Sequence, residues 1–214
     1  NPCGAVVGKD EIFRLLLIVR KYPNCIVIAD EIYDGLDFTG EQKSVASLSP
    51  DVPVFVLNGV SKVFYAPGWR IGYLGIHDPK ARLTLVRDSI ERLLRSRLCA
   101  STPAQLGYLA GLDSDRTWMK SYSEKIIKQR NLCIDRIGNI DGLEVQSSGG
   151  AFYMFVKLTD DKWHENDKDF VLQLLHEEHV LVVHGSGFSA ELGKGHFRIV
   201  YLPNVDVLND AFDR

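Results

Sequence analysis

The chain has 214 residues, of which 45% are hydrophobic and 25% charged, the composition of an ordinary globular protein with enough chain to bury a core. Its formal net charge is −3, from 25 basic and 28 acidic residues, so it carries no excess of positive charge for binding nucleic acid. No apolar run reaches the roughly 20 residues that a membrane-spanning helix needs, because the longest candidate, Ile12–Tyr22, is broken by arginines.

The first part of the chain alternates helix and strand patterns. After a turn-like opening, apolar residues at helical spacing predict a helix over Lys9–Tyr22. Short β-rich runs predict buried strands at Cys25–Ala29, Val54–Leu57 and Arg70–Ile76. Continuous apolar strands are typical of a parallel or mixed sheet covered on both faces.

Three helices are predicted next, over Ala81–Leu98, Thr102–Leu112 and Thr117–Ile137. The pattern then changes to a strand over Gly149–Leu158, a helix over Asp169–His179, and strands over His179–Val183 and His196–Leu202. The sequence therefore predicts two domains. Residues 1–125 form part of a larger α/β domain with a mostly parallel sheet, and residues 126–214 form a smaller α+β domain.

The four cysteines are scattered and form no CxxC pair: Cys3, Cys25, Cys99 and Cys133. This spacing favours free thiols in a reducing, cytoplasmic setting and indicates no zinc site. The chain opens at Asn1 without an initiator methionine and stops inside an apparent helix at Arg214. We therefore expect it to be a fragment of a longer protein.

Two charged residues follow neighbouring predicted strands. Asp30 ends the first strand, and Lys62 ends the next one. Side chains at the carboxyl ends of parallel strands meet at one edge of the sheet, where open α/β sheets bind ligands. An amine and a carboxylate there match the needs of pyridoxal phosphate: the amine bonds to the cofactor and moves protons, and the carboxylate pairs with the pyridine nitrogen. Alternatively, Asp30 caps a following helix or faces solvent, and Lys62 is a solvated surface residue.

Other residues extend this candidate site. Tyr33 and Asn1 are candidates for hydrogen bonding to the cofactor ring oxygen. Taken alone, Tyr33 is equally explained as an aromatic residue of the core, and Asn1 as part of a simple turn. Arg70, framed by glycine, and the hydroxyl of Ser61 are candidates for the phosphate.

Arg198 lies inside an apolar strand, His-Phe-Arg-Ile-Val. An arginine in such a strand needs an anion or must face solvent. A substrate carboxylate is a suitable bidentate partner, and an outward-facing strand residue is the equal alternative.

In order and combination, these segments resemble the class I/II, fold-type I, pyridoxal-phosphate-dependent aminotransferases. The matching stretches are NPCG, ADEIYDGL around Asp30, NGVSKVFYAPGWRIGYLG around Lys62, SSGGAFYMFVKL, and GHFRIVYL around Arg198. The amino-acid sequences of NGVSK and VVHGSGF are most similar to those of alanine- or aspartate-type members. The resemblance covers essentially the whole chain.

The resemblance implies the fold-type I large domain with its mostly parallel sheet, a smaller carboxy-terminal domain, and a homodimer. It implies that Lys62 carries the Schiff base, that Asp30 pairs with the pyridine nitrogen, and that Arg198 binds the substrate carboxylate. It further implies that Asn1 and Tyr33 bind the ring oxygen and that Arg70 binds the phosphate.

Two departures and one absence qualify the resemblance. Gly59 stands where many relatives carry a phosphate-binding serine, and His184 stands where many carry proline. The family's glycine-rich phosphate loop and the aromatic residue that stacks on the cofactor would precede Asn1. We therefore expect the activity to belong to the parent protein, with little or none from this chain alone.

The activity implied is transfer of an amino group from an amino acid to a 2-oxo acid. A lyase or decarboxylase on the same fold would need Lys62 and Asp30 equally. A transcriptional regulator with a cofactor-sensing domain and a cofactor-free remnant are alternatives of other classes. Intact Asp30, Lys62, Arg70 and Arg198 argue against the remnant.

Overall fold

A computed structural model describes all residues from Asn1 to Arg214. The chain divides into two compact units, Val7–Thr117 and a second unit that joins Asn1–Val6 to Trp118–Arg214. The predicted boundary at residues 125 and 126 thus differs from this division in two ways. The second unit begins with its long helix, and it includes the first residues of the chain. Gly150 N donates to Gly4 O at 2.9 Å, which pairs those first residues with the second unit.

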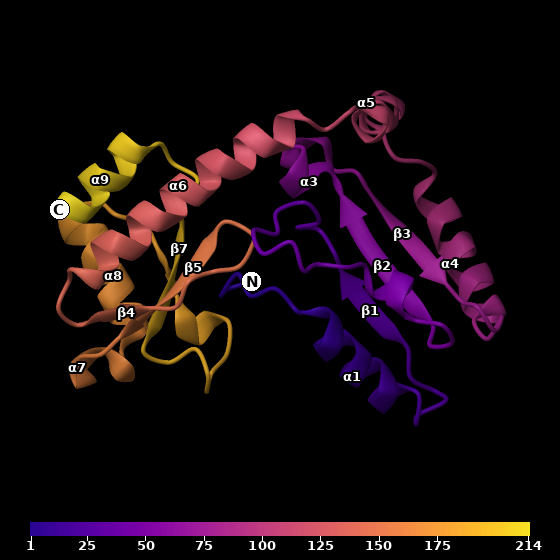
Figure 1. The fold of residues 1–214 in the computed structure, drawn as a ribbon, viewed down its shortest axis with the longest axis horizontal. Coiled ribbons are helices and arrows are strands. Elements are labelled where there is room, and N and C mark those ends of the chain that lie inside the picture. The colour runs from indigo at the N-terminus through magenta and orange to yellow at the C-terminus, as the bar shows by residue number, and fades with distance from the viewer. The chain divides into compact units, whose positions relative to one another are not determined.

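The unit Val7–Thr117 is built on a three-stranded sheet of order β1-β2-β3 (Figure 1). The strands are β1 (Val27–Asp30), β2 (Val54–Gly59) and β3 (Gly72–His77). β1 pairs with β2 in parallel, and β2 pairs with β3 in antiparallel fashion. The sheet of this chain is therefore mixed, with its one parallel pairing between the two strands that precede the candidate residues.

Helix α1 (Lys9–Val19) packs on this unit through Ile12 and Leu16, which form a buried cluster with Val52. Its apolar residues recur at helical spacing, so one face is buried while the opposite face stays exposed. The remaining helical elements are α2 (Val45–Leu48), α3 (Val60–Val63), the 3-10 turn η1 (Pro67–Trp69), α4 (Thr84–Arg97) and α5 (Thr102–Asp113).

The expectation that both faces of this sheet are covered does not hold within the chain. Ile28, Leu57 and Leu74 share one face by the strand register, yet they are 63%, 39% and 37% exposed. Continuous apolar strands indicate that a sheet is built for cover on both faces, but they do not say which segment provides the cover.

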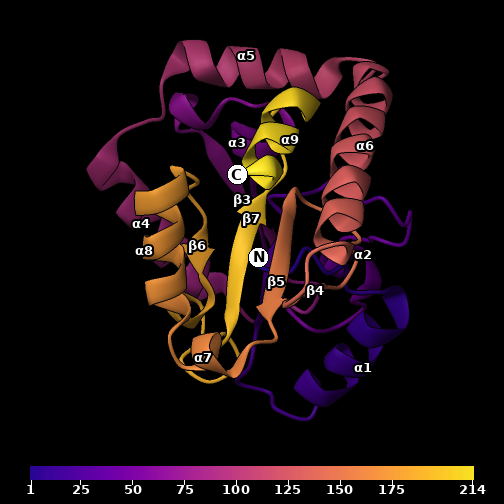
Figure 2. The same cartoon turned by 90° about the vertical axis from the view of Figure 1, so that its left-hand side faces the viewer.

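The second unit has a four-stranded antiparallel sheet of order β4-β5-β7-β6. Its strands are β4 (Leu143–Val145), β5 (Tyr153–Leu158), β6 (Val183–His184) and β7 (His196–Val200). The accompanying helical elements are α6 (Trp118–Gly138), α7 (Asp161–His164), α8 (Asp167–Glu178), the 3-10 turn η2 (Gly185–Gly187) and α9 (Val205–Asp213). Figure 2 shows α6 and α8 beside this sheet, with α9 next to α6.

The core of this unit lies under one face of the sheet. Met154 and Val156 of β5 are fully buried, as is Cys133 of α6. Ile126 and Ile137 of α6 are also buried, at a spacing that puts them on the same side of the helix as Cys133. The alternate residues of β5 and β7 point to the other face, which carries Arg198.

Two strand predictions in this unit began too early. A strand was predicted over His179–Val183, but His179 has a left-handed backbone (φ 57°) that ends α8, so only Val183–His184 is a strand. A strand was also predicted from Gly149, but Ala151 has φ 58°, which delays β5 until Tyr153. A left-handed residue breaks the extended path that a strand requires.

None of the helices combines the length and apolar character needed to span a membrane. No three His, Cys, Asp or Glu side chains gather as they would around a metal ion.

Cys133 gives a test of the core of the second unit. Burial raises the pKa of its thiol to about 11, so near pH 8 it is both protonated and inaccessible. Iodoacetamide at pH 8 should leave Cys133 unmodified in the folded protein and modify it in urea, where the pKa returns to about 8.5. Because the folded pKa exceeds the unfolded one, this group should also make the protein less stable as the pH rises from about 8.5 towards 11.

Peptide mass spectrometry reads out the labelling, with the exposed Cys3 as the internal control. Equal labelling of the two cysteines in the folded protein would mean that the α6 face is not packed as described.

Candidate functional site

Asp30 lies at the carboxyl end of β1 and pairs in parallel register with Leu57 of β2. Both strands therefore end at the same edge of the sheet, as predicted. The Asp30 carboxylate is exposed, and its Oδ1 accepts a hydrogen bond from Ile32 N at 3.2 Å. This bond belongs to a local turn and not to a helix cap, and the exposed carboxylate fits the alternative in which Asp30 faces solvent. A carboxylate has about four lone-pair sites, so one such bond leaves capacity for a ligand.

Tyr33 follows in the turn that leaves β1. Asp34 N donates to Glu31 O at 2.9 Å, and Leu36 N donates to Tyr33 O at 2.8 Å, so the backbone on either side of the tyrosine is fixed. Leu36 is 2% exposed and anchors the end of the turn in the core. The turn therefore holds Tyr33 three residues beyond Asp30.

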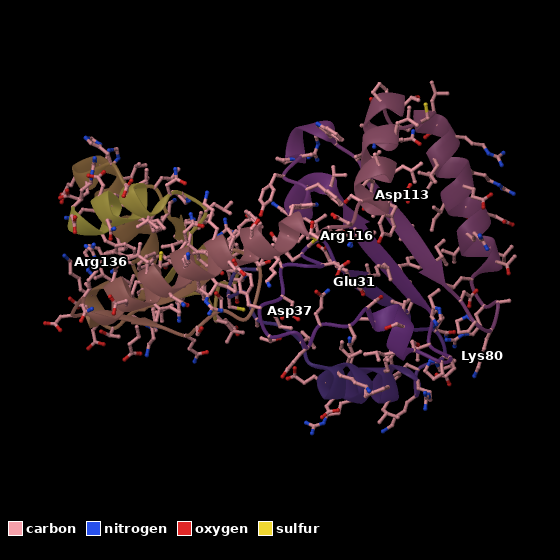
Figure 3. All side chains as sticks on the ribbon, turned by 45° about the horizontal axis from the view of Figure 1, so that its top comes forward. Glu31, Asp37, Lys80, Asp113, Arg116 and Arg136 are labelled. Atoms are coloured by element: carbon pink, nitrogen blue, oxygen red, sulfur yellow. The ribbon has the colours of Figure 1, made fainter.

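Two acidic residues, Glu31 and Asp37, accept hydrogen bonds from the chain after this turn; both are labelled in Figure 3. Glu31 Oε1 accepts from Val45 N at 2.9 Å, and Asp37 accepts from Thr39 and from Gln42 N, at 2.8 Å for the latter. Burial by itself raises the pKa of Asp37, but the hydrogen bonds from Thr39 and Gln42 outweigh it and leave the pKa below its usual value. Both carboxylates hold the loop in place next to the candidate site.

Lys62 lies in α3, not at the end of a strand as the sequence suggested. Strand β2 ends at Gly59, and the next residues form one helical turn that buries Val60 and Val63. Residues three apart lie on the same side of a helix, so this turn buries Val60 and Val63 together. Lys62 is half-buried in this turn, with its Nζ 5.9 Å from the centre of the Tyr33 ring.

Arg70 also departs from its predicted position, because it precedes strand β3 instead of entering it. It ends the turn η1 with a left-handed backbone (φ 53°), and its Nη1 donates to Pro67 O at 2.8 Å. Pairing with β2 continues only to Gly72, where a side chain would lie 2.6 Å from Asn58 O. Ser61, the second phosphate candidate, lies in α3 beside Lys62.

Asn1 and Arg198 meet in the second unit. Arg198 Nη1 donates a hydrogen bond of 2.6 Å to Asn1 Oδ1, across almost the whole length of the sequence. Gly4 makes this approach possible, because its φ of +65° suits glycine and a side chain there would lie 2.7 Å from Gly150 O. The sequence predicted roles for both residues but not that they bond to each other.

The guanidinium of Arg198 lies over two aromatic rings, with Cζ 4.5 Å from the centre of the Tyr153 ring and 4.9 Å from that of Phe188. Its Nε is buried and has no hydrogen-bond partner. An unpaired buried donor costs about 1–3 kcal/mol, and cation–π contacts contribute about 0.5–2 kcal/mol each. The two rings therefore offset much of the cost of holding Arg198 in this position, on the sheet face opposite the core and with Nη1 at the exposed end.

A buried polar network supports the loop that holds the first residues. Arg130 Nη1 donates to Ser148 O at 2.9 Å, and the Ser148 hydroxyl bonds to the Tyr201 hydroxyl at 2.9 Å. Burial raises the pKa of Tyr201 to about 12, with the Ser148 bond opposing the shift. The network fixes the loop before β5, on which Gly4 packs.

The predicted residues thus form two groups, each within one unit. Asp30, Tyr33, Ser61, Lys62 and Arg70 belong to the unit Val7–Thr117, where Lys62 lies beside Tyr33. Asn1 and Arg198 belong to the other unit and are hydrogen-bonded. Sequence reasoning missed Tyr153 and Phe188 as partners of Arg198. The quoted stretch SSGGAFYMFVKL contains Tyr153, but neither ring has a pattern that predicts contact with an arginine.

The first group fits pyridoxal phosphate in chemical type. It offers an amine beside a phenol, a carboxylate with spare acceptor capacity at the neighbouring strand end, and an arginine in the loop that follows. In the second group, Arg198 Nε is a buried donor without an acceptor, in a side chain suited to an anion. The donor set therefore fits the cofactor and a carboxylate substrate.

Comparison with known proteins agrees with this chemistry. The family model described as "Aminotransferase class I and II" matches residues 1–210. The chain is 36% identical over 219 residues to the glutamate-pyruvate aminotransferase AlaA of Haemophilus influenzae, covering 100% of this chain and 54% of that protein. It is 32% identical to a tyrosine aminotransferase of Dictyostelium discoideum, covering 100% of this chain and 52% of that protein.

Among solved structures, the alanine aminotransferase of Pyrococcus furiosus is 46% identical and superposes with a TM-score of 0.95, over 100% of this chain and 53% of that one. The chain thus spans about half the length of the relatives it matches. The match nevertheless runs through both groups of candidate residues. This chain belongs to the class I and II aminotransferase family.

Proposed function

We propose that the full-length protein is an aminotransferase that uses pyridoxal phosphate to move an amino group from an amino acid to a 2-oxo acid. The observation that carries the proposal is the placement of Lys62 beside Tyr33, with Asp30 ending the parallel neighbouring strand, in a chain of this family. These residues supply an amine, a phenol and a carboxylate, the set that the reaction requires.

Pyridoxal phosphate, when bound, supplies an aldehyde that takes the amino group and an aromatic ring that withdraws electrons from the substrate. Lys62 would hold the cofactor, and its amine would move a proton to and from the substrate α-carbon. The carboxylate of Asp30 keeps the pyridine nitrogen protonated by charge pairing, and the hydroxyl of Tyr33 donates to the ring oxygen.

The remaining candidates bind the anionic ends of the two ligands. Arg70 and the hydroxyl of Ser61 hold the phosphate, and Arg198 holds the substrate carboxylate. Asn1 accepts a hydrogen bond from Arg198 through Oδ1, so its amide N–H groups remain as donors for the cofactor ring oxygen.

The names of the relatives narrow the first substrates to test. The Haemophilus protein is named for glutamate and pyruvate and the Pyrococcus protein for alanine, and the latter is 46% identical. We therefore propose alanine and a 2-oxo acid such as 2-oxoglutarate as the first pair. The Dictyostelium relative is named for tyrosine, so an aromatic donor is the second pair.

The alternatives weighed from the sequence have less support. A lyase, a decarboxylase or a regulatory domain would preserve the same lysine and aspartate, but the relatives reported above are named aminotransferases. Formation of a new keto acid only when a second oxo acid is supplied would separate transfer from elimination.

The partners and location are part of the proposal. The family resemblance supports a homodimer. The four cysteines are free, which supports a reducing, cytoplasmic setting.

Lys62 is tested by trapping the cofactor. The full-length protein, incubated with pyridoxal phosphate and reduced with borohydride, should carry the pyridoxyl mass on Lys62, and Lys62→Ala should abolish both labelling and turnover. Peptide mass spectrometry identifies the modified residue. Lys43→Ala changes an exposed lysine on the loop after Asp37 and is the matched control. It should keep both the labelling of Lys62 and turnover. Labelling of another lysine in the wild-type protein would refute the assignment.

Asp30 is tested by removing its charge. Asp30→Asn should lower kcat by about 100- to 1,000-fold, because a neutral amide no longer stabilises the protonated pyridine ring. Steady-state kinetics of the full-length protein measure the effect. Asp34→Asn changes an exposed carboxylate in the same turn and should have normal kinetics. Near-normal turnover of Asp30→Asn would contradict the proposed role.

Arg198 is tested by the concentration dependence of the reaction. Arg198→Ala should raise the KM for the amino acid by about 10- to 100-fold, the effect expected for losing a hydrogen bond to a charged group. Arg198→Lys keeps the charge without the planar fork, so its KM should be intermediate. An unchanged KM for Arg198→Ala would show that the carboxylate binds elsewhere.

A further inference from the structure

Tyr153 and Phe188, here named the aromatic clamp, lie against the same guanidinium, that of Arg198. Both distances, 4.5 and 4.9 Å, lie inside the range of cation–π attraction. The clamp leaves Nε buried without an acceptor, whereas the Nη1 bond to Asn1 lies at the exposed end of the side chain. The arginine therefore presents only its Nη end to a ligand.

The two sides of the clamp are held differently. Tyr153 is 5% exposed, and its backbone is paired with Val200 in the sheet, so its position is set by the fold. Phe188 is 37% exposed and lies on the loop after η2. Its ring packs edge-on against Phe155, with centroids 6.0 Å apart. Phe188 is thus the side whose position depends on a loop.

A buried carboxylate anchors that loop. Asp167, the first residue of α8, is 2% exposed, and its Oδ2 accepts from Ser186 N at 2.8 Å. Phe188 N donates to Gly185 O at 2.8 Å, which closes the turn. Gly185 fits only as glycine, because a side chain there would lie 2.2 Å from Gly193 O. The loop is therefore held on both sides, and Phe188 has a fixed place.

We propose that Phe188 is a positioning residue for the substrate carboxylate, which acts through Arg198, and that Asp167 keeps Phe188 in that place. The inference rests on the proposed role of Arg198. Phe188 restricts the guanidinium to one orientation, so the Nη fork is ready for a planar carboxylate and loses less freedom when it binds. Without the ring, the side chain has room to turn, and binding must order it.

The test uses the full-length protein loaded with its cofactor. Phe188→Leu removes the ring and keeps an apolar side chain, Phe188→Tyr restores a ring, and Phe170→Leu changes a phenylalanine of α8 that contacts Trp163 and Phe197 instead of Arg198. We expect Phe188→Leu to raise the KM for the amino acid by about 3- to 30-fold with kcat within about twofold of wild type. The other two variants should stay near wild type.

Two further measurements do not depend on turnover. The dissociation constant of propionate, a carboxylate without an amino group, should rise in Phe188→Leu by the same factor as KM. In protein labelled with ¹⁵N-arginine, rotation of the Arg198 guanidinium about its Nε–Cζ bond should be slow in the wild type and faster in Phe188→Leu, with Arg198→Lys identifying the signal. Asp167→Asn should shift both readouts in the same direction by a smaller factor.

The outcomes separate the two claims. If Arg198→Ala raises KM while Phe188→Leu leaves KM, propionate binding and guanidinium rotation unchanged, the positioning role is wrong and the role of Arg198 stands. If Arg198→Ala leaves KM unchanged, the carboxylate role fails and the inference fails with it. If Phe188→Leu does not fold, Phe188→Met takes its place with the same expected values, and unchanged values there overturn the proposal.

Discussion

The parallel pairing of β1 with β2 is the constraint on which the first group of candidate residues depends. Its register sets Asp30 opposite Leu57, so both strands run out at the same edge. The chain leaves one strand through the turn that carries Tyr33 and the other through the helical turn that carries Lys62, and the two side chains meet at 5.9 Å. A shift of one residue in register would turn Asp30 to the other face of the sheet. The chemistry of the site thus depends on backbone hydrogen bonds that involve none of its side chains.

In the second unit, a charged side chain is held within an apolar sheet. Arg198 lies opposite Phe155 in the sheet, next to the rings of Tyr153 and Phe188. Its Nε has no hydrogen-bond acceptor. The two aromatic rings attract the positive charge, and the Asn1 amide oxygen accepts a hydrogen bond from Nη1. Both contacts lower the free-energy cost of placing the guanidinium in the sheet. An anion binds at the exposed Nη end of such a site, because the two rings already orient the guanidinium. Preorganisation of this kind is how binding proteins limit the entropy that a ligand must overcome.

Glycines and buried polar groups maintain this arrangement at positions far apart in sequence. Gly4 lets the first residues pack against the loop before β5, and that loop is held by the hydrogen bonds of Ser148 to Arg130 and Tyr201. Asp167 plays the corresponding part for the loop that carries Phe188. In each case a polar group that would be costly to bury alone is paired with a backbone or side-chain partner. The structural residues are therefore as specific in position as the residues proposed to do chemistry.

The sequence by itself determined the long helices, the two parallel strands with an acid and a lysine after them, and the membership of the family, because periodicity and short motifs are local properties. It did not determine where strands stop. Lys62 lies in a helical turn that buries Val60 and Val63, and Arg70 and His179 have left-handed backbones that local propensity does not reveal. Nor did it pair Asn1 with Arg198, or place Tyr153 and Phe188 on the guanidinium. Those contacts join segments distant in the chain, and only the packed tertiary structure decides which distant side chains share a surface.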